Sequence, residues 1–151
     1  MTKAYNNHDR LLVAVDCIIF GFDGTEIKAL LVKRSLEPEK GKWSLMGGFV
    51  GAKESVHDAA TRVLEHLTGL DNVYMEQLHC FGDVKRDAAG RVVSVAYFAL
   101  IKLDDYKAAL LQKHQASWFS LHKIPAVVFD HKQMIALSLE RLQQKAIAYP
   151  I

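Results

Sequence analysis

The residues with the greatest capacity for chemistry lie between Gly48 and Leu70, in the segment GFVGAKESVHDAATRVLEHLTGL. Carboxylates gathered on one face of a helix would bind Mg²⁺, which prefers oxygen ligands in octahedral geometry. This segment supplies Glu54, just before the predicted helix, and an imidazole at His66, which suits zinc, copper or nickel better than magnesium. The segment therefore has few of the ligands that a magnesium site requires.

The helix that would carry such a site is predicted over residues 55–68. Ser55 is the expected N-cap, Asp58 lies at the third helical position, and Gly69 follows the last turn. Glu65 falls on a polar face of this helix and is interpreted as a surface charge paired with Arg62 or with solvent. Spacings of four, three and four residues place one apolar face on Val56, Ala60, Val63 and Leu67.

The spacing of the whole segment resembles the Nudix box, G-x5-E-x7-R-E-U-x-E-E-x-G-U, in which U is apolar. The matching positions are Gly48, Glu54, Arg62, Gly69 and Leu70. By resemblance, the two glycines shape a loop–helix–loop, Arg62 braces that loop, and Glu54 is the surviving candidate ligand or base. The three helix glutamates of the family fall on Val63, His66 and Leu67.

The resemblance covers residues 11–148 and implies the Nudix α/β/α sandwich with a mixed β-sheet. In active members of the family, the box glutamates hold Mg²⁺ or Mn²⁺, and the ions activate water that cleaves nucleoside diphosphate derivatives. Because the helix glutamates are replaced here, the sequence predicts neither a catalytic residue nor a metal ligand. Mg²⁺ is expected only under the alternative of a hydrolase that uses Glu54.

A narrower likeness is carried by the runs CIIFGF, GKWSLMGGFV, RVVSVAYFALI and PAVVFDH. They resemble the N-terminal domain of Nudix-related transcriptional regulators, in which this domain senses a small molecule. Some members of that group respond to ADP-ribose, and others, which this chain resembles more closely, control pentose use and respond to L-arabinose. The resemblance implies a homodimer, and it implies that DNA is bound through a winged helix expected after residue 151. Residues 1–10 are predicted to be a flexible N-terminus and residues 11–151 the Nudix-like domain.

The remaining pattern predicts the element order β-β-β-α-β-β-β-α. A hairpin turn at Asp23-Gly24 separates two apolar strands, and a third strand passes through Gly47-Gly48. Asp130 is expected to cap a last helix that continues to residue 148. The predicted strands lie over 11–22, 26–34, 43–50, 73–83, 91–103 and 115–121, and the apolar stripe of the last helix over Ile135, Leu139, Leu142 and Ala146.

Composition limits the other classes of function. The chain has 151 residues and a formal net charge of +2, which is too small to indicate nucleic-acid or membrane binding by charge alone. No apolar run approaches the roughly 20 residues of a membrane span. Cys17 and Cys80 lie in apolar runs and are interpreted as reduced core residues of a cytoplasmic protein.

Several polar and aromatic residues outside the box are candidates for a ligand pocket. Asp16 interrupts the apolar run LLVAVDCIIF, so it either faces a pocket or pairs with an arginine or a backbone amide. Lys85, Arg86 and Asp87 either close over a ligand or form a solvated turn, and Ser94 and Tyr97 point to opposite faces of one strand. The predicted ligand-binding residues are Asp16, Arg34, Trp43, Glu54, Arg86 and Tyr97.

The sequence thus favours a binding domain over an enzyme. Its expected role is to sense a small effector for a transcriptional regulator, and the resemblance favours L-arabinose over ADP-ribose as that effector. The alternatives are a Mg²⁺-dependent hydrolase of a compound such as ADP-ribose and a dimerisation domain without a ligand.

Overall fold

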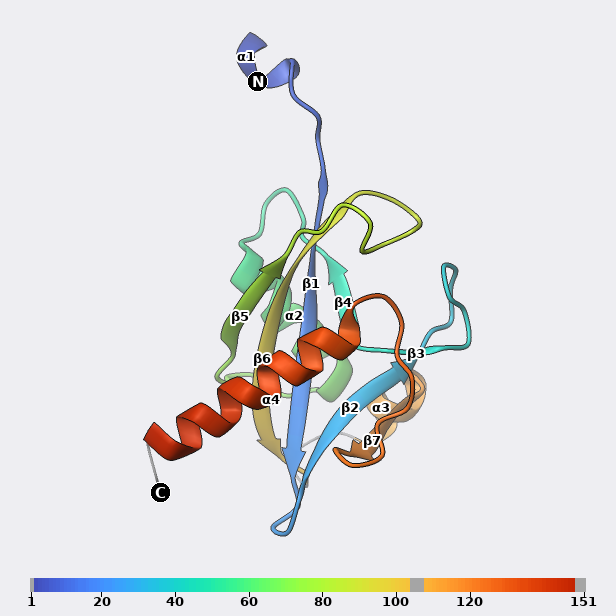
Figure 1. The fold of residues 1–151 in the computed structure, drawn as a ribbon, viewed down its shortest axis with the longest axis vertical. Helices are drawn as coiled ribbons and strands as arrows, with labels where there is room; N and C mark the ends of the chain where they lie inside the picture. The colour runs from blue at the N-terminus through green and yellow to red at the C-terminus, as the bar shows by residue number, and fades with distance from the viewer. Residues whose placement is uncertain (1, 104–107, 149–151) are drawn as a thin grey trace.

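Two long strands form the centre of the fold in the computed structural model, which describes residues 2–103 and 108–148. β1 (Leu12–Phe22) and β6 (Val92–Lys102) run parallel along their whole lengths (Figure 1). The middle of β1 is buried on both faces, as expected for a nearly continuous run of apolar and β-branched residues. The two strands therefore divide the core into two layers.

Shorter strands complete the sheet on both sides of this pair. β2 (Ile27–Lys33) is antiparallel to the second half of β1, and β4 (Met46–Phe49) is antiparallel to its first half. The path is β3 (Trp43–Ser44), β2, β1, β6 and β5 (Glu76–Phe81), with β7 (Ala116–Ser120) added beside β2. One parallel pair among antiparallel pairs makes the sheet mixed, as predicted.

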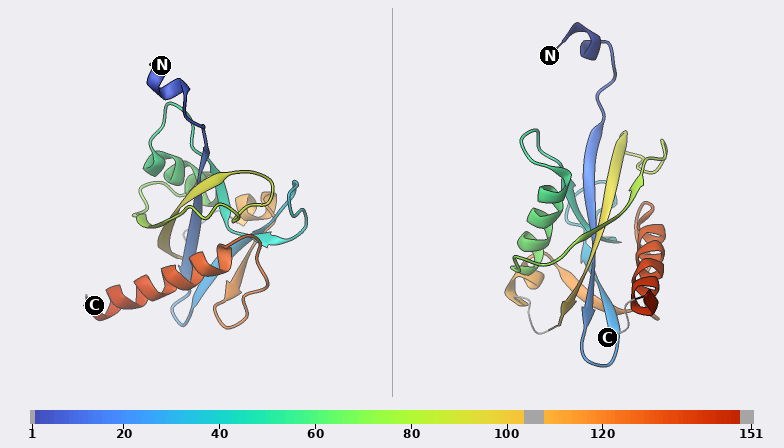
Figure 2. Two further views of the ribbon diagram at one scale, coloured as in Figure 1. Left: turned by 45° about the horizontal axis from the view of Figure 1, so that its top comes forward. Right: turned by 90° about the vertical axis from the view of Figure 1, so that its left-hand side faces the viewer.

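Helices cover both faces of the sheet. α2 (Val56–Thr68) packs on one face and α4 (His131–Ala148) on the other, which the edge-on view of Figure 2 shows plainly. Two clusters of buried side chains lie under these helices, one around Val15 and Val63 and the other around Phe20 and Met134. This arrangement confirms the α/β/α sandwich. Two short helices, α1 (Lys3–Asn6) and α3 (Ala108–Lys113), complete the described chain.

The ends of α2 follow the predicted capping chemistry. The Ser55 side chain accepts the backbone N–H of Asp58 at 3.0 Å, and Gly69 adopts the left-handed conformation with φ of 75°. The predicted apolar face packs into the core, where Val63 is 3% exposed and Leu67 is 1% exposed. These contacts fix the helix at the position where the box residues fall.

Four details differ from the sequence predictions. The strand expected over 43–50 is interrupted at Leu45, and α3 was not predicted, because a six-residue helix depends on packing more than on its own sequence. The apolar stripe of α4 ends at Leu142, and Ala146 is exposed. Cys80 is exposed on the edge strand β5, whereas Cys17 is buried as expected. In the described ranges, no helix combines the length and apolarity needed to cross a bilayer.

Candidate functional site

A cavity of about 520 Å³ opens at the end of the sheet where β1 and β6 begin and β4 ends. Apolar walls come from the strand ends, and polar groups come from the connecting loops and the start of α4. Its volume is typical of small-molecule sites. The residues that matter for its chemistry are Leu12, Asp16, Arg34, Gly47, Phe49, Arg86, Asp87, Val92, Phe129 and His131.

Asp16 is a buried charged residue in the lining of this cavity. It shares a face of β1 with Ile18 and Phe20, whose side chains belong to the core under α4. Only 8% of the residue is exposed, and its Oδ2 accepts the hydroxyl of Ser94 on β6 at 2.6 Å. A buried carboxylate requires such partners, because an uncompensated buried charge is costly.

Arg86 closes the same network from the loop between β5 and β6. Its Nε and NH2 donate to the two carboxylate oxygens of Asp130 at 2.8 and 2.7 Å, and its NH2 lies 3.8 Å from Oδ2 of Asp16. The Arg86 side chain is 5% exposed. Burial acts to lower the pKa of Arg86, but Asp130 and Asp16 raise it overall. The guanidinium is therefore a permanent cation between two carboxylates.

His131 supplies the third partner of Asp16 from the first position of α4. Its Nδ1 accepts the backbone N–H of Leu45 at 3.1 Å, which places the ring proton on Nε2. That nitrogen lies 3.4 Å from Oδ1 of Asp16. Burial acts to raise the pKa of Asp16, but His131, Ser94 and Arg86 together lower it below its ordinary value. Asp16 is thus held as a carboxylate at neutral pH.

Gly47 allows β4 to approach this network. Asp16 is the register partner of Gly47 in the antiparallel pair of β1 and β4. A Cβ atom at position 47 would lie 2.6 Å from Oδ1 of Asp16 and 2.6 Å from the carbonyl oxygen of Val15. Glycine is therefore required here by a close approach of backbone and carboxylate.

The carboxylate of Glu54 is engaged in hydrogen bonds within the protein. Its Oε1 accepts the NH2 of Arg62 at 2.7 Å and the backbone N–H of Gly51 at 2.9 Å, and its Oε2 accepts the Nε of Arg62 at 3.2 Å. Arg62 also donates to the carbonyl oxygen of Phe49 at 3.1 Å, which confirms the predicted bracing of the loop. The pKa of Glu54 is lowered, first by the hydrogen bond from Arg62.

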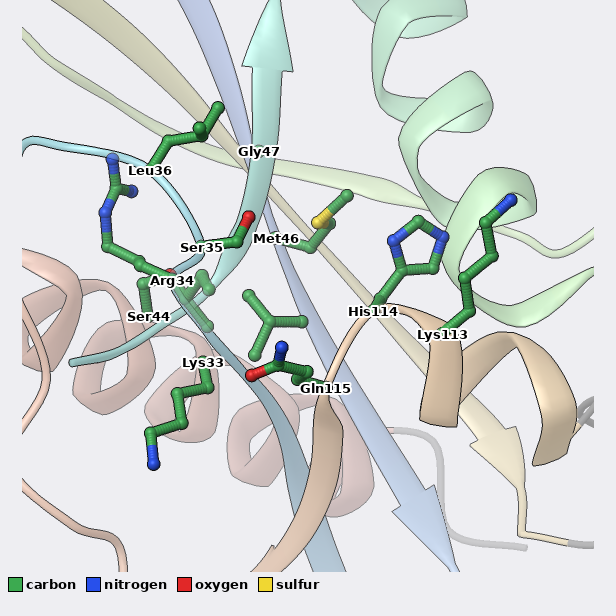
Figure 3. A pocket seen from close by; sticks show the side chains of 12 residues that line it. Lys33, Arg34, Ser35, Leu36, Ser44, Met46, Gly47, Lys113, His114 and Gln115 are labelled. Atoms are coloured by element: carbon green, nitrogen blue, oxygen red, sulfur yellow. The ribbon is translucent and has the colours of Figure 1, made fainter. Parts of the chain in front are cut away.

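A second cavity, of about 250 Å³, lies between β2, β4 and α3 (Figure 3). Figure 3 shows Met46 and His114 next to each other at this cavity, which shares Arg34, Leu36, Leu45 and Gly47 with the first one. The rings of His66 and His114 lie 4.8 Å apart between centroids. Burial, followed by the neighbouring His66, lowers the pKa of His114.

The structure brings together three of the six predicted ligand-binding residues: Asp16, Arg34 and Arg86 all line the larger cavity. Trp43 packs edge-on against Phe119, with centroids 4.9 Å apart, and Glu54 faces Arg62. Tyr97 lies on the α2 side of the sheet, where its hydroxyl lies 3.3 Å from Gln77 Oε1. Ser94 does lie on the opposite face, as predicted.

Sequence reasoning missed the two residues that complete the Asp16 network. Asp130 was expected to cap the last helix, but its carboxylate binds Arg86 instead. His131 was not singled out, although it follows Asp130 in the quoted run PAVVFDH. The signal available was the need of a buried Asp16 for partners, which does not say where in the chain they lie.

The sequence profile of the NUDIX domain matches residues 10–138. The chain belongs to the Nudix family. Membership of this family accounts for three features of the chain: the glycines at positions 48 and 69, the loop braced by Arg62, and the sandwich architecture.

Three relatives illustrate the range of the family around this chain. The ADPR responsive transcriptional repressor NtrR of Acinetobacter baylyi is 35% identical over 138 residues, which are 89% of this chain and 55% of the repressor. The ADP-ribose pyrophosphatase of Methanocaldococcus jannaschii is 34% identical over 88% of this chain and 76% of the enzyme. The NUDIX domain of Shewanella oneidensis NrtR, crystallised with ADP ribose, is 33% identical with a TM-score of 0.72, covering 94% and 99% of the two chains.

The Nudix helix of this chain does not fit the magnesium ions of the hydrolases. Val63 and Leu67 have no lone pairs and pack into the core, and His66 offers nitrogen rather than oxygen. Glu54, the remaining carboxylate of the box, is already bonded to Arg62 and Gly51. Within the described ranges, no three His, Cys, Asp or Glu residues are grouped so that they could hold a metal ion. We therefore derive no metal-dependent step for this chain.

Proposed function

We propose that this chain is an effector-sensing Nudix domain that binds ADP-ribose in the larger cavity and does not hydrolyse it. The observation that carries the proposal is the contrast between the two faces of the sheet. One face has a hydrogen-bonded charged network beside an open cavity, and the other has apolar residues at the positions of the metal ligands.

The chemistry of the cavity suits a nucleotide-like ligand. Its carboxylates at Asp16 and Asp87 can accept hydrogen bonds from ribose hydroxyls, and Arg34 adds positive charge to the lining for an anionic ligand. Leu12, Val92 and the aromatic ring of Phe129 supply apolar wall. The likeness to a repressor described as ADPR responsive supports the same ligand class.

In such a regulator, ADP-ribose would bind one arrangement of the protein better than another and shift the population that holds DNA. The homodimer and the DNA contact belong to this proposal, because the chain spans 55% of the length of the A. baylyi repressor. L-arabinose remains a prediction of the sequence resemblance, and the relatives described above are named for ADP-ribose.

The hydrolase is the second candidate, because the M. jannaschii pyrophosphatase is nearly as similar as the repressor. It would need to act without the helix carboxylates. Release of AMP from ADP-ribose with Mg²⁺ present, abolished by Glu54→Gln, would establish hydrolysis and contradict the proposal.

Isothermal titration of the chain with ADP-ribose and with L-arabinose, each with and without Mg²⁺, tests the proposal. Two aspartates of one loop provide a matched pair of variants. Asp87 lines the cavity and its Oδ1 accepts the N–H of Ala89, whereas Asp83 makes the same kind of bond to Lys85 outside the cavity. Saturable binding of ADP-ribose that does not depend on Mg²⁺ is expected. Asp87→Asn should weaken it about 10-fold or more, the size of a charged hydrogen bond, and Asp83→Asn should not.

Binding of L-arabinose alone would contradict the choice of ligand. Equal effects of Asp87→Asn and Asp83→Asn would contradict the choice of cavity.

A further inference from the structure

We infer that Phe129 and Arg34 form a stacking surface for a planar aromatic ring, so that the site selects ligands that carry a nucleobase. The inference rests on the proposed function, since it concerns the same cavity. It specifies that the cavity recognises the nucleobase of the ligand. The charged network by itself does not specify which part of the ligand is recognised.

Phe129 is held in a backbone conformation that phenylalanine rarely adopts. Its φ is 53°, in the left-handed region that favours glycine. Both neighbours of Phe129 are held in place: the backbone N–H of Val128 donates to the carbonyl oxygen of Trp43 at 3.0 Å, and the side chain of Asp130 is held by Arg86. Such strained residues persist where the surroundings determine them, and they concentrate at ligand sites.

The ring of Phe129 is positioned by two neighbours. The guanidinium carbon of Arg34 lies 5.2 Å above the ring centroid, and the ring of His131 meets it edge-on with centroids 5.5 Å apart. Arg34 is itself fixed, because its Nε donates to the carbonyl oxygen of Pro38 at 2.7 Å. Phe129 and Arg34 both line the cavity.

The charge of Arg34 remains available to a ligand. In the ranges 2–103 and 108–148, Arg34 makes no ion pair, and its side-chain hydrogen bond goes to a neutral carbonyl group. A guanidinium that lies over an aromatic ring presents a flat, positively charged surface. A nucleobase can stack on this surface, and the positive charge also attracts the π electrons of the base. A free pentose has no π face, so this pair favours a nucleotide-like ligand over a sugar alone.

Replacement of the ring tests the inference. Phe129→Leu keeps an apolar side chain and removes the aromatic face, and Phe129→Trp restores an aromatic face. Phe81→Leu is the matched control, because Phe81 is also half-buried and contacts a histidine ring edge-on, but lies outside the cavity. The ligands are ADP-ribose, which carries a base, and ribose 5-phosphate, which does not. Thermal unfolding of each variant establishes that it is folded.

Phe129→Leu is expected to weaken ADP-ribose binding about 10-fold, within the range of base stacking on an aromatic ring, and to leave ribose 5-phosphate binding unchanged. Phe129→Trp should recover most of the loss, and Phe81→Leu should change neither affinity. Equal losses for both ligands, or no loss at all, would overturn the stacking surface while ADP-ribose still binds. If the unmodified chain binds no ADP-ribose, the proposed function itself fails.

Discussion

Removal of Arg86 is the sharpest test of the charged network. Arg86→Met keeps much of the length of the side chain and deletes a guanidinium that is 5% exposed. It leaves Asp130 without two charge-assisted hydrogen bonds and Asp16 without a cation at 3.8 Å. Breaking a buried ion pair from one side costs about 3–5 kcal/mol, and we expect about 3 kcal/mol because Asp130 retains 13% exposure and some access to water.

The loss should depend on pH with a definite sign. In the unmodified protein the folded-state pKa of Asp16 is lowered, so its stabilising contribution is present above the unfolded value and is lost as pH falls. In Arg86→Met, Asp16 keeps His131 and Ser94 but loses a nearby cation, so its pKa is lowered less and less stability is lost as pH falls. The difference in unfolding free energy between the proteins is therefore expected to be large at pH 7 and to shrink as pH falls below about 4.

Urea denaturation at a series of pH values measures this difference. Lys85→Met is the matched control, because Lys85 is the exposed neighbour in the same loop and carries the same charge. Asp130→Asn should cost less in the Arg86→Met background than in the unmodified chain, which gives a coupling energy of about 1 kcal/mol or more. A loss below about 1 kcal/mol, or the same loss at both ends of the pH range, would refute the reasoning.

Two further predictions follow from local geometry. Gly47→Ala should lower the free energy of unfolding by more than about 1 kcal/mol and weaken ligand binding, because the added Cβ would lie 2.6 Å from Oδ1 of Asp16. Unchanged denaturation and titration curves for this variant would contradict the prediction. A thiol reagent should label the exposed Cys80 of the folded chain and leave Cys17 unreactive, because Cys17 is buried and burial raises its pKa. If peptide mapping found both cysteines labelled in the native protein, Cys17 would be accessible and the prediction would be wrong.

The sequence was sufficient to predict the elements whose signals are local. The cap at Ser55, the left-handed Gly69 and the apolar face of α2 lie within one segment, and the structure confirms all three. The strand through Asp16 was equally clear from its run of β-branched residues. Local periodicity determines such elements, so no knowledge of their partners was needed.

The site was only partly predictable, because its contacts join distant parts of the chain. The need of Asp16 for a partner could be inferred, but Ser94 and His131 follow it by many residues, and no spacing rule connects them. The exposure of Cys80 likewise depends on β5 being an edge strand, which is a property of the sheet and not of the segment. Glu54 could be assigned to Arg62 only after the loop geometry was known.

The position of the network on the sheet bears on the proposal that this chain binds a nucleotide without hydrolysing it. Val63 and Leu67 stand where the family has carboxylates, and they fill the core on the α2 side. Asp16 and His131 lie on the other side, under α4, and their contacts do not pass through α2. The apolar residues at the positions of the family's metal ligands therefore lie apart from Asp16 and its hydrogen-bonded partners. Under the proposed function, recognition of a nucleotide does not require carboxylates on α2, which is the combination that the proposed sensor needs.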